Sequence, residues 1–435
     1  MNRGYIQFAK SLFFRYNQLN HLHNCMRQDS GAIPAAKTRT LSCCVYIKIF
    51  TQRMTIDKTI FQEEITVMRN QDRFRGCLLG GAAGDALGYA VEFMQEDEIF
   101  RRYGRNGITE YDLKNGKARI SDDTQMTLFT ATGLLLATTR DMLRGIMGSY
   151  AGYVHSAYTD WLKTQQEKYP LPDQFHYSWL VNVPELFSRR APGNTCISGL
   201  ASGRMGTIEK PINDSKGCGG VMRVAPVGLY FNDKNIDIKK LARIGAETAA
   251  ITHGHILGWL PAAAMVQIIH EISQNDAAVP EAVQHSLRTA VEMWPETEEL
   301  DYFVRLMNKA VELAGMDMED LEAIHRLGKG WVAEETLAIA VYCALKYEND
   351  FDRALIASVN HGGDSDSTGA VTGNILGAKW GLNGIPEKYC TDLELREVIL
   401  EVADDLWHDC RMNEYEEETW DQAWLWKYME MTWRK

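Results

Sequence analysis

The stretch Arg75-Gly76-Cys77-Leu78-Leu79-Gly80-Gly81-Ala82-Ala83-Gly84-Asp85-Ala86-Leu87-Gly88 repeats glycine at every fourth position. In a helix this spacing gives one smooth face, because residues four apart lie on the same side. Glycine costs a helix about 1 kcal/mol per residue relative to alanine, so four glycines require a compensating gain from close packing. Such spacing is typical of membrane dimer helices, but Asp85 and the short apolar run exclude that interpretation here. The stretch therefore predicts a helix packed closely against a second one.

A second glycine series lies near the C-terminal end, where Gly369, Gly373 and Gly377 keep the same spacing. We therefore predict a central pair of glycine-faced helices whose backbones approach each other. Helical periodicity also dominates the segments between the two series, and no alternation of comparable length indicates a strand. The sequence thus predicts an all-α protein. Helices are expected at residues 142–169, 256–274, 277–292, 297–315 and 332–346, and in the acidic, tryptophan-rich tail at 391–435.

Two acidic clusters lie at predicted helix starts. The segment His361-Gly362-Gly363-Asp364-Ser365-Asp366-Ser367-Thr368-Gly369 opens the second glycine helix, and Ser121-Asp122-Asp123-Thr124 opens an apolar run from Gln125 to Thr139. Carboxylates and hydroxyls at helix starts serve as N-caps, but a cap needs only one acceptor. If the fold brings the clusters together, the surplus oxygens form a two-metal site that suits magnesium better than zinc. From spacing alone, this site and two independent caps are equally open.

Three other polar positions have two interpretations each. Glu92 ends the apolar pattern of the first glycine helix, as solvated glutamates commonly do, but beside a metal pair it would be a general base or acid. The run from Gly217 to Gly220 lies in a long irregular stretch, and such stretches are often functional. Its amides suit a diphosphate, although an ordinary turn also explains the glycines. His253 and His255 point apart at a helix end, so we expect capping or ligand contact rather than a shared metal.

Charge divides the chain of 435 residues, whose net charge is −12, into two parts. Residues 1–53 hold eight lysines and arginines against Asp29 alone, a charge of +7, so the remainder carries −19. An acidic body excludes general nucleic-acid binding, which needs clustered basic residues. Nine cysteines without paired spacing indicate reduced thiols, and no apolar run is expected to span a membrane. A cytoplasmic location is expected.

The basic N-terminal portion is predicted to form an extension, residues 1–70, that is flexible or binds a partner. Seven apolar and aromatic residues between Tyr5 and Leu19 fall at helical spacing among basic ones. The segment has three open interpretations: an organelle transit peptide, an arm that folds onto a partner, and a non-native leader before Met54. Aromatic residues in a basic arm suit an acidic protein cleft, which slightly favours the partner arm over a tail without a role.

Seven motifs between residue 72 and about residue 410 resemble those of the ADP-ribosylglycohydrolase family, which includes the dinitrogenase reductase-activating glycohydrolase. The motifs are Gly84-Asp85-x-x-Gly88-x-x-x-Glu92, Ser121-Asp122-Asp123-Thr124, Arg190-Ala191-x-Gly193-x-Thr195, Gly217-x-Gly219-Gly220-x-Met222-Arg223, His253-Gly254, Trp331-Val332-Ala333-Glu334-Glu335 and Gly362-Gly363-Asp364-x-Asp366. Each motif alone is weak evidence, but their common order over most of the chain is strong. The resemblance implies a single large orthogonal helical domain at residues 71–435 and a binuclear magnesium or manganese site.

Carried over to this sequence, the resemblance implies a role for each matching residue. The metal ligands would be Ser121, Asp122, Asp123, Asp364, Asp366 and Ser367; the catalytic groups Glu92, Asp122 and Asp123; and the substrate contacts Gly193, Asn194, Gly217, Cys218, Gly219, Gly220, Met222 and His253. Ser121 and Ser367 stand where the family often has threonine, which keeps the oxygen donor. Cys218 replaces a residue that is frequently polar.

The implied activity is metal-dependent hydrolysis of the N-glycosidic bond between ADP-ribose and a protein side chain, with arginine as the expected acceptor. The expected cofactors are two Mg²⁺ (or Mn²⁺) ions, and the expected partner is an ADP-ribosylated protein. An alternative is an immunity protein that binds and occludes an ADP-ribosyltransferase toxin through its N-terminal extension, with or without hydrolysis. A catalytically silent relative is disfavoured, because all the acidic positions are present.

Overall fold

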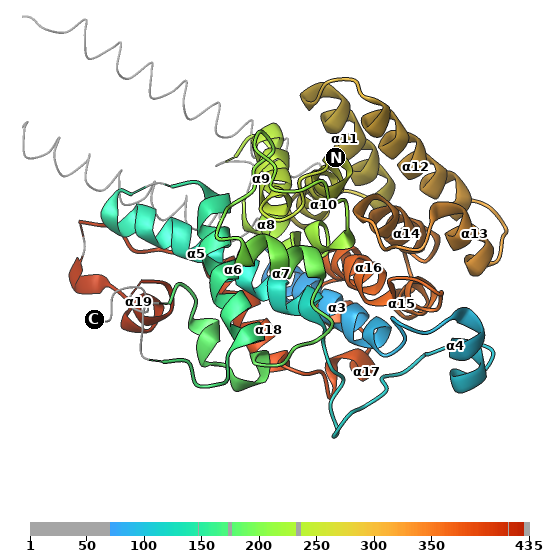
Figure 1. Ribbon diagram of the computed structural model, residues 1–435, viewed down its shortest axis with the longest axis horizontal. Coiled ribbons are helices and arrows are strands. Elements are labelled where there is room, and N and C mark those ends of the chain that lie inside the picture. The colour runs from blue at the N-terminus through green and yellow to red at the C-terminus, as the bar shows by residue number, and fades with distance from the viewer. Residues whose placement is uncertain (1–69, 147, 173–175, 232–235, 416, 430–435) are drawn as a thin grey trace, which may run out of the picture. The chain divides into compact units, whose positions relative to one another are not determined.

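Helices make up the regular structure of the protein (Figure 1). The computed structural model describes residues 70–429 except residues 147, 173–175, 232–235 and 416. Within these residues no β-strand occurs and only three isolated bridges pair extended residues, so the all-α prediction is confirmed. The predicted amphipathic helix and partner arm before residue 70 lie outside the described residues, and the proposed boundary there stays a prediction.

The described residues form helices α3 to α19 and five short 3₁₀ turns. The α-helices are α3 (Gln71–Tyr89), α4 (Glu96–Tyr103), α5 (Asp122–Arg144), α6 (Tyr150–Gln166), α7 (Asn194–Ala201), α8 (Ala225–Tyr230), α9 (Ile238–Ala250), α10 (Ile256–Asn275), α11 (Val279–Met293), α12 (Glu298–Ala314), α13 (Asp320–Leu327), α14 (Ala333–Lys346), α15 (Phe351–Val359), α16 (Ser365–Trp380), α17 (Glu387–Cys390), α18 (Arg396–His408) and α19 (Gln422–Tyr428). The 3₁₀ turns are η1 (Trp179–Asn182), η2 (Pro184–Leu186), η3 (Cys218–Gly220), η4 (Leu382–Gly384) and η5 (Glu417–Thr419).

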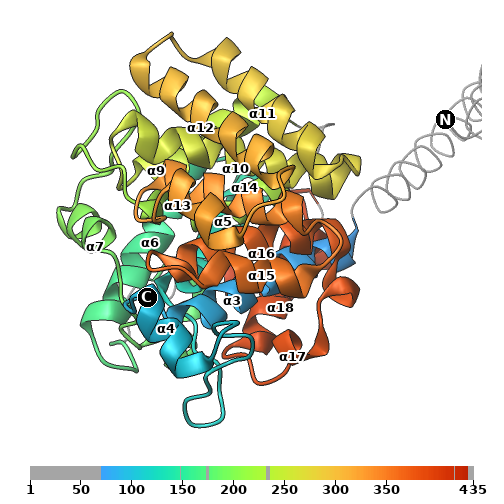
Figure 2. The same cartoon turned by 90° about the vertical axis from the view of Figure 1, so that its right-hand side faces the viewer.

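Helices α3 and α16 form the predicted central pair and lie side by side (Figure 2). They run antiparallel, so that Gly84 faces Gly369 and Gly80 faces Gly373. A Cβ atom added to Gly84 would lie 2.0 Å from the carbonyl oxygen of Gly369, which leaves no room for any side chain. The glycine-faced pair is therefore confirmed. The pair matters for function because Glu92 lies in the turn that follows α3, and because α16 begins at the second acidic cluster.

Most predicted helices are found within a few residues of their expected bounds, but one differs in kind. The segment expected as one helix at 142–169 is divided, because α5 continues to Arg144 and ends at Gly145 in the left-handed conformation (φ +60°). A new helix, α6, starts after Ser149, whose side chain accepts a hydrogen bond from the amide of Gly152. The prediction missed this glycine C-cap and serine N-cap.

Six short helices and the C-terminal tail also depart from the prediction. Helices α4, α7, α8, α13, α15 and α17 were not expected, and the tail forms α18 and α19 rather than one helix. The short helices outside the tail have too few turns to give a clear hydrophobic period in the sequence.

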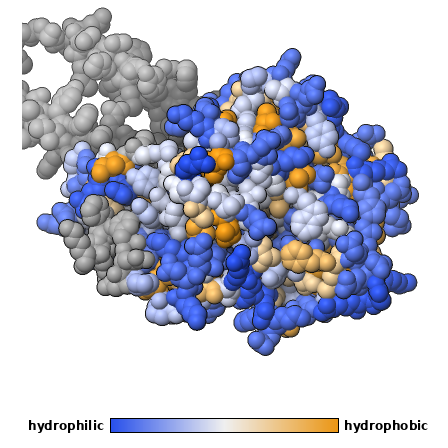
Figure 3. Space-filling model, in the orientation of Figure 1, coloured by the Kyte–Doolittle hydropathy of each residue, from blue (hydrophilic) through white to orange (hydrophobic). Residues whose placement is uncertain are grey.

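Helix α10 is long and apolar enough to cross a membrane, with a mean hydropathy of 1.3, although no such run was expected from the sequence. However, 89% of that window is buried inside the protein, which is typical of a core helix. It packs against α8, α9, α11 and α14. On the face drawn in Figure 3, hydrophilic side chains predominate and apolar ones appear in small separate groups.

Candidate active site

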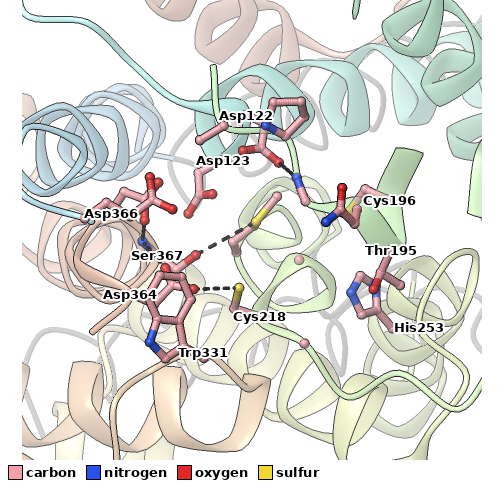
Figure 4. A pocket seen from close by; sticks show the side chains of 18 of the residues that line it. Asp122, Asp123, Thr195, Cys196, Cys218, His253, Trp331, Asp364, Asp366 and Ser367 are labelled. Carbon is pink, nitrogen blue, oxygen red and sulfur yellow. Dashed lines mark hydrogen bonds between the residues drawn. The ribbon is translucent and has the colours of Figure 1, made fainter. Parts of the chain in front are cut away.

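A pocket of about 560 Å³ lies where the starts of α5 and α16 meet the loops around Gly193 and Gly217 (Figure 4). This volume falls within the range of small-molecule sites, about 300–1,000 Å³. Of the site residues predicted from the sequence, all but Ser121 and Gly220 line the pocket. Motifs that are far apart in the chain thus converge on one cavity.

The two acidic clusters face each other across this pocket. Asp122 and Asp123 come from the first turn of α5, and Asp364 and Asp366 come from the start of α16. Glu92, just after α3, is the fifth carboxyl group. All five are at least nine-tenths buried, and within the part of the chain that the structure describes none of them forms an ion pair with lysine, arginine or histidine.

Capping accounts for only part of these two clusters. Ser121 is the N-cap of α5 and accepts a hydrogen bond from the amide of Asp123 at 3.2 Å. Asp364 is the N-cap of α16 and accepts one from the amide of Ser367 at 3.3 Å. The capping interpretation is therefore correct for one residue in each cluster, and the surplus carboxylates are left to face the pocket.

Burial and mutual repulsion make the charged forms of these carboxyls unfavourable. Burial, and then the neighbouring Asp366 carboxylate, raises the pKa of both Asp122 and Asp123 well above the usual range. The same two causes raise the pKa of Glu92 to about 11. One oxygen each of Glu92 and Asp123 is buried without a hydrogen-bond partner. A buried carboxylate oxygen without a partner is costly when it is charged, so a bound proton or cation would stabilise this cluster.

The donor set fits hard divalent cations. It consists of carboxylates with the hydroxyls of Ser121 and Ser367 nearby, which are the oxygen ligands that Mg²⁺ prefers. In the described ranges, no three side chains of histidine, cysteine, aspartate or glutamate converge closely enough to enclose an ion by themselves. The metal site and the identity of its ion therefore stay predictions.

Asp85 positions the first acidic cluster, a role that the sequence did not reveal. This fully buried residue of α3 accepts hydrogen bonds from the amides of Ser121, at 2.9 and 3.1 Å, and Thr124, at 3.1 Å. Burial and the Asp366 carboxylate raise its pKa to about 7, against the opposing effect of these hydrogen bonds. The central helix pair therefore holds the start of α5 directly as well as carrying the start of α16.

The opposite wall of the pocket is formed mainly by backbone and neutral groups. The amide of Gly193 donates to Asp122 at 3.2 Å, and Asn194 opens α7 beside it. Cβ atoms added to Gly217 and Gly219 would lie 3.4 and 2.9 Å from the ring of His253, so a side chain at either position would crowd that ring. Burial lowers the pKa of His253 to about 3, which keeps its ring neutral.

Two predicted site residues lie outside the pocket lining. Ser121 is fully buried behind it, although its hydroxyl interacts with the Asp366 carboxylate. Gly220 packs against α10 instead, since a Cβ there would lie 2.5 Å from the carbonyl oxygen of Gly258. His255, by contrast, caps α10 by accepting a hydrogen bond from the amide of Leu257, as one of its interpretations predicted.

The pocket also contains residues to which the sequence assigned no role. Phe93 and Trp331 stack at 6.4 Å between ring centroids, and Arg189 is the only lysine or arginine among the described lining residues. Cys218, which the sequence analysis named as a substrate contact, donates its thiol proton to Asp364 at 2.9 Å (Figure 4). Sequence position could have identified Phe93, Trp331 and Arg189, because each lies inside a motif or within three residues of one.

The fold and the site define an all-helical protein whose paired helix starts place acidic residues around one pocket. The family model of the ADP-ribosylglycohydrolases matches residues 66–416, and the chain belongs to this family. The mouse ADP-ribosylhydrolase ARH3 is 27% identical over 76% of this chain and 90% of its own length. The ADP-ribosyl-[dinitrogen reductase] glycohydrolase of Rhodospirillum rubrum is 26% identical over 75% of this chain and 91% of its own.

Among solved structures, a chain described as an ADP-ribosylglycohydrolase-related protein complex aligns with 78% of this chain and 98% of its own length. Its sequence identity is 21% and its TM-score is 0.47. The family assignment rests on the sequence matches, and the chain is accordingly a glycohydrolase-type hydrolase.

Proposed function

We propose that this protein hydrolyses the N-glycosidic bond between ADP-ribose and an arginine side chain of a modified protein, and that it needs divalent metal ions. This proposal rests on five buried carboxyl groups around a pocket of about 560 Å³, none of which pairs with a basic side chain among the described residues. The name of the Rhodospirillum rubrum relative, a glycohydrolase of an ADP-ribosylated protein, supports the reaction type.

The cofactor in this proposal is a pair of Mg²⁺ or Mn²⁺ ions. Their ligands would be Ser121, Asp122, Asp123, Asp364, Asp366 and Ser367. When bound, such ions supply positive charge that orients hydroxyl groups and makes water a better nucleophile. Their presence would also relieve the repulsion among the carboxylates, which is the feature that makes the donor set fit them.

The protein's own residues would act on the substrate from both walls of the pocket. On the acidic wall, carboxylates stabilise the positive charge that develops at C1 of the ribose as the glycosidic bond breaks. Glu92, whose pKa is raised by burial, holds a proton near that bond and can donate it to the leaving nitrogen. On the opposite wall, amides of Gly193, Gly217 and Gly219 suit the diphosphate.

Substitution of one aspartate from each cluster tests this function. Asp122→Ala and Asp366→Ala should each abolish release of ADP-ribose from an ADP-ribosylated arginine peptide, with the helical circular dichroism spectrum intact. Asp97→Ala, at an exposed position on α4, is the matched control and should keep full activity. Assays with and without Mg²⁺, and with a serine-linked peptide in parallel, separate metal dependence from acceptor preference. Undiminished turnover by either cluster variant would refute the site.

A second candidate function rests on the charge of residues 1–53, which is +7. We propose that this segment binds the acidic cleft of an ADP-ribosyltransferase toxin and occludes it. Deletion of residues 1–53 should abolish transferase binding and leave hydrolysis unchanged. Equal binding by the shortened chain would remove this role.

A further inference from the structure

Two aromatic side chains remain open to solvent at the edge of the pocket. Phe93 is 71% exposed and Trp331 is 42% exposed, and both line the cavity. Their ring centroids lie 6.4 Å apart and their planes differ by 25°, so they form one stacked unit. Exposed apolar residues are ordinary when scattered, but an adjoining pair at a pocket marks a binding surface.

The backbone fixes both rings next to the acidic wall. Phe93 directly follows Glu92 in the turn after α3. The carbonyl oxygen of Trp331 accepts a hydrogen bond from the amide of Cys218 at 3.3 Å, and the thiol of Cys218 in turn bonds to Asp364. In Figure 4 Trp331 lies beside Asp364, whereas His253 lies at the other end of the pocket.

This combination of aromatic faces and carboxylates selects for a particular chemical class. Ring faces carry partial negative charge and attract cations, and nearby carboxylates add to that attraction. A guanidinium group is planar, always charged and weakly hydrated, so it stacks on aromatic rings more readily than an ammonium group does. A serine hydroxyl offers neither the plane nor the charge.

We infer that Phe93 and Trp331 form the acceptor subsite, on which the guanidinium of a modified arginine stacks while the ADP-ribose occupies the rest of the pocket. The inference rests on the proposed function and names the side chains that would determine its acceptor preference. The rings belong at the leaving-group end of the site because they adjoin Glu92, the proposed proton donor.

The test changes the ring faces while keeping their apolar volume. Phe93→Leu and Trp331→Leu should each lower kcat/KM for an ADP-ribosylated arginine peptide roughly tenfold and weaken binding of that peptide similarly. Trp331→Phe keeps an aromatic face and should restore most of both losses. The affinity for free ADP-ribose, measured by calorimetry, should stay within about twofold, because the rings hold only the acceptor. Trp380→Leu is the matched control, since Trp380 is 40% exposed but lies outside the pocket.

Three results would overturn the subsite: wild-type peptide affinity and turnover in the leucine variants, an equal loss of affinity for free ADP-ribose, or an equal loss of activity on a serine-linked peptide. Failure of the proposed function has a different signature, namely no release of ADP-ribose by the wild-type protein with Mg²⁺ present. In that case the affinity of each variant for the modified peptide tests the subsite. Weaker binding by Trp331→Leu supports the subsite, and unchanged binding rejects it.

Discussion

Substitution of Gly373 by alanine should destabilise the protein through the central helix pair. The α-carbon of Gly373 faces the backbone of Gly80 in the antiparallel partner helix. An added Cβ would lie 2.0 Å from the Gly80 carbonyl oxygen and 2.5 Å from its carbonyl carbon. Both neighbours are backbone atoms in buried helices, so no side chain can rotate away to relieve the clash.

The size of the effect follows from this distance. Ordinary contact begins at 3.4 Å, so the helices would have to separate locally by about 1.4 Å, the difference between 3.4 and 2.0 Å. Overpacking of this kind typically costs about 1–3 kcal/mol or more, while alanine regains about 1 kcal/mol of helix propensity. Because both clashing atoms belong to backbone, we expect a net loss of about 2 kcal/mol in the free energy of unfolding, and a fall in Tm of about 2–3 °C.

Denaturant and thermal unfolding followed by circular dichroism would measure this loss. Gly315→Ala is the control, because its Cβ would approach no atom closer than 3.5 Å and its φ of −85° suits alanine. The control should match the wild-type protein within about 0.5 kcal/mol. A Gly373→Ala variant as stable as the wild type would refute the close-packing explanation of the glycine series.

Three further predictions concern the acidic site. Asp85→Asn weakens the hydrogen-bond acceptor that holds the amide of Thr124. The Mg²⁺ affinity measured by calorimetry should therefore fall about 10- to 100-fold. An unchanged affinity would count against positioning by Asp85. Mg²⁺ at a hundred times its Kd should stabilise the wild-type protein by about 2.7 kcal/mol relative to EDTA, and Asp366→Asn should reduce this gain; no difference in Tm between Mg²⁺ and EDTA would contradict a metal site. Cys218→Ala removes the thiol that donates to Asp364, whereas Cys218→Ser keeps a donor, so kcat/KM should be lower for alanine than for serine, and the opposite order would exclude this hydrogen bond as the cause.

Features with a local sequence signature were predicted well. The four-residue glycine spacing defines one face of a helix, and such a face stabilises a helix only when another backbone packs against it. The surplus of acceptors at two helix starts likewise indicated that capping was not their only task. That these two clusters meet was a hypothesis, and the structure shows Asp122 and Asp366 lining the same pocket.

Features that depend on the approach of distant segments were not predictable in this way. The buried Asp85 has the same local pattern whether it lies at a packed interface or holds the amides of a neighbouring helix. The stacking of Phe93 on Trp331 and the packing of Gly220 against α10 likewise produce no periodic pattern in the sequence.

The sequence alone therefore determined the helical class, the glycine-faced pair and the residue types of the acidic clusters, because hydrophobic and glycine periodicity and local composition are properties of neighbouring residues. Only the tertiary structure decided which carboxylates share a pocket, which residue of each cluster is used as a cap, and which aromatic rings adjoin them. The physical reason is that burial, repulsion and hydrogen bonding depend on distances between atoms that the chain order does not specify.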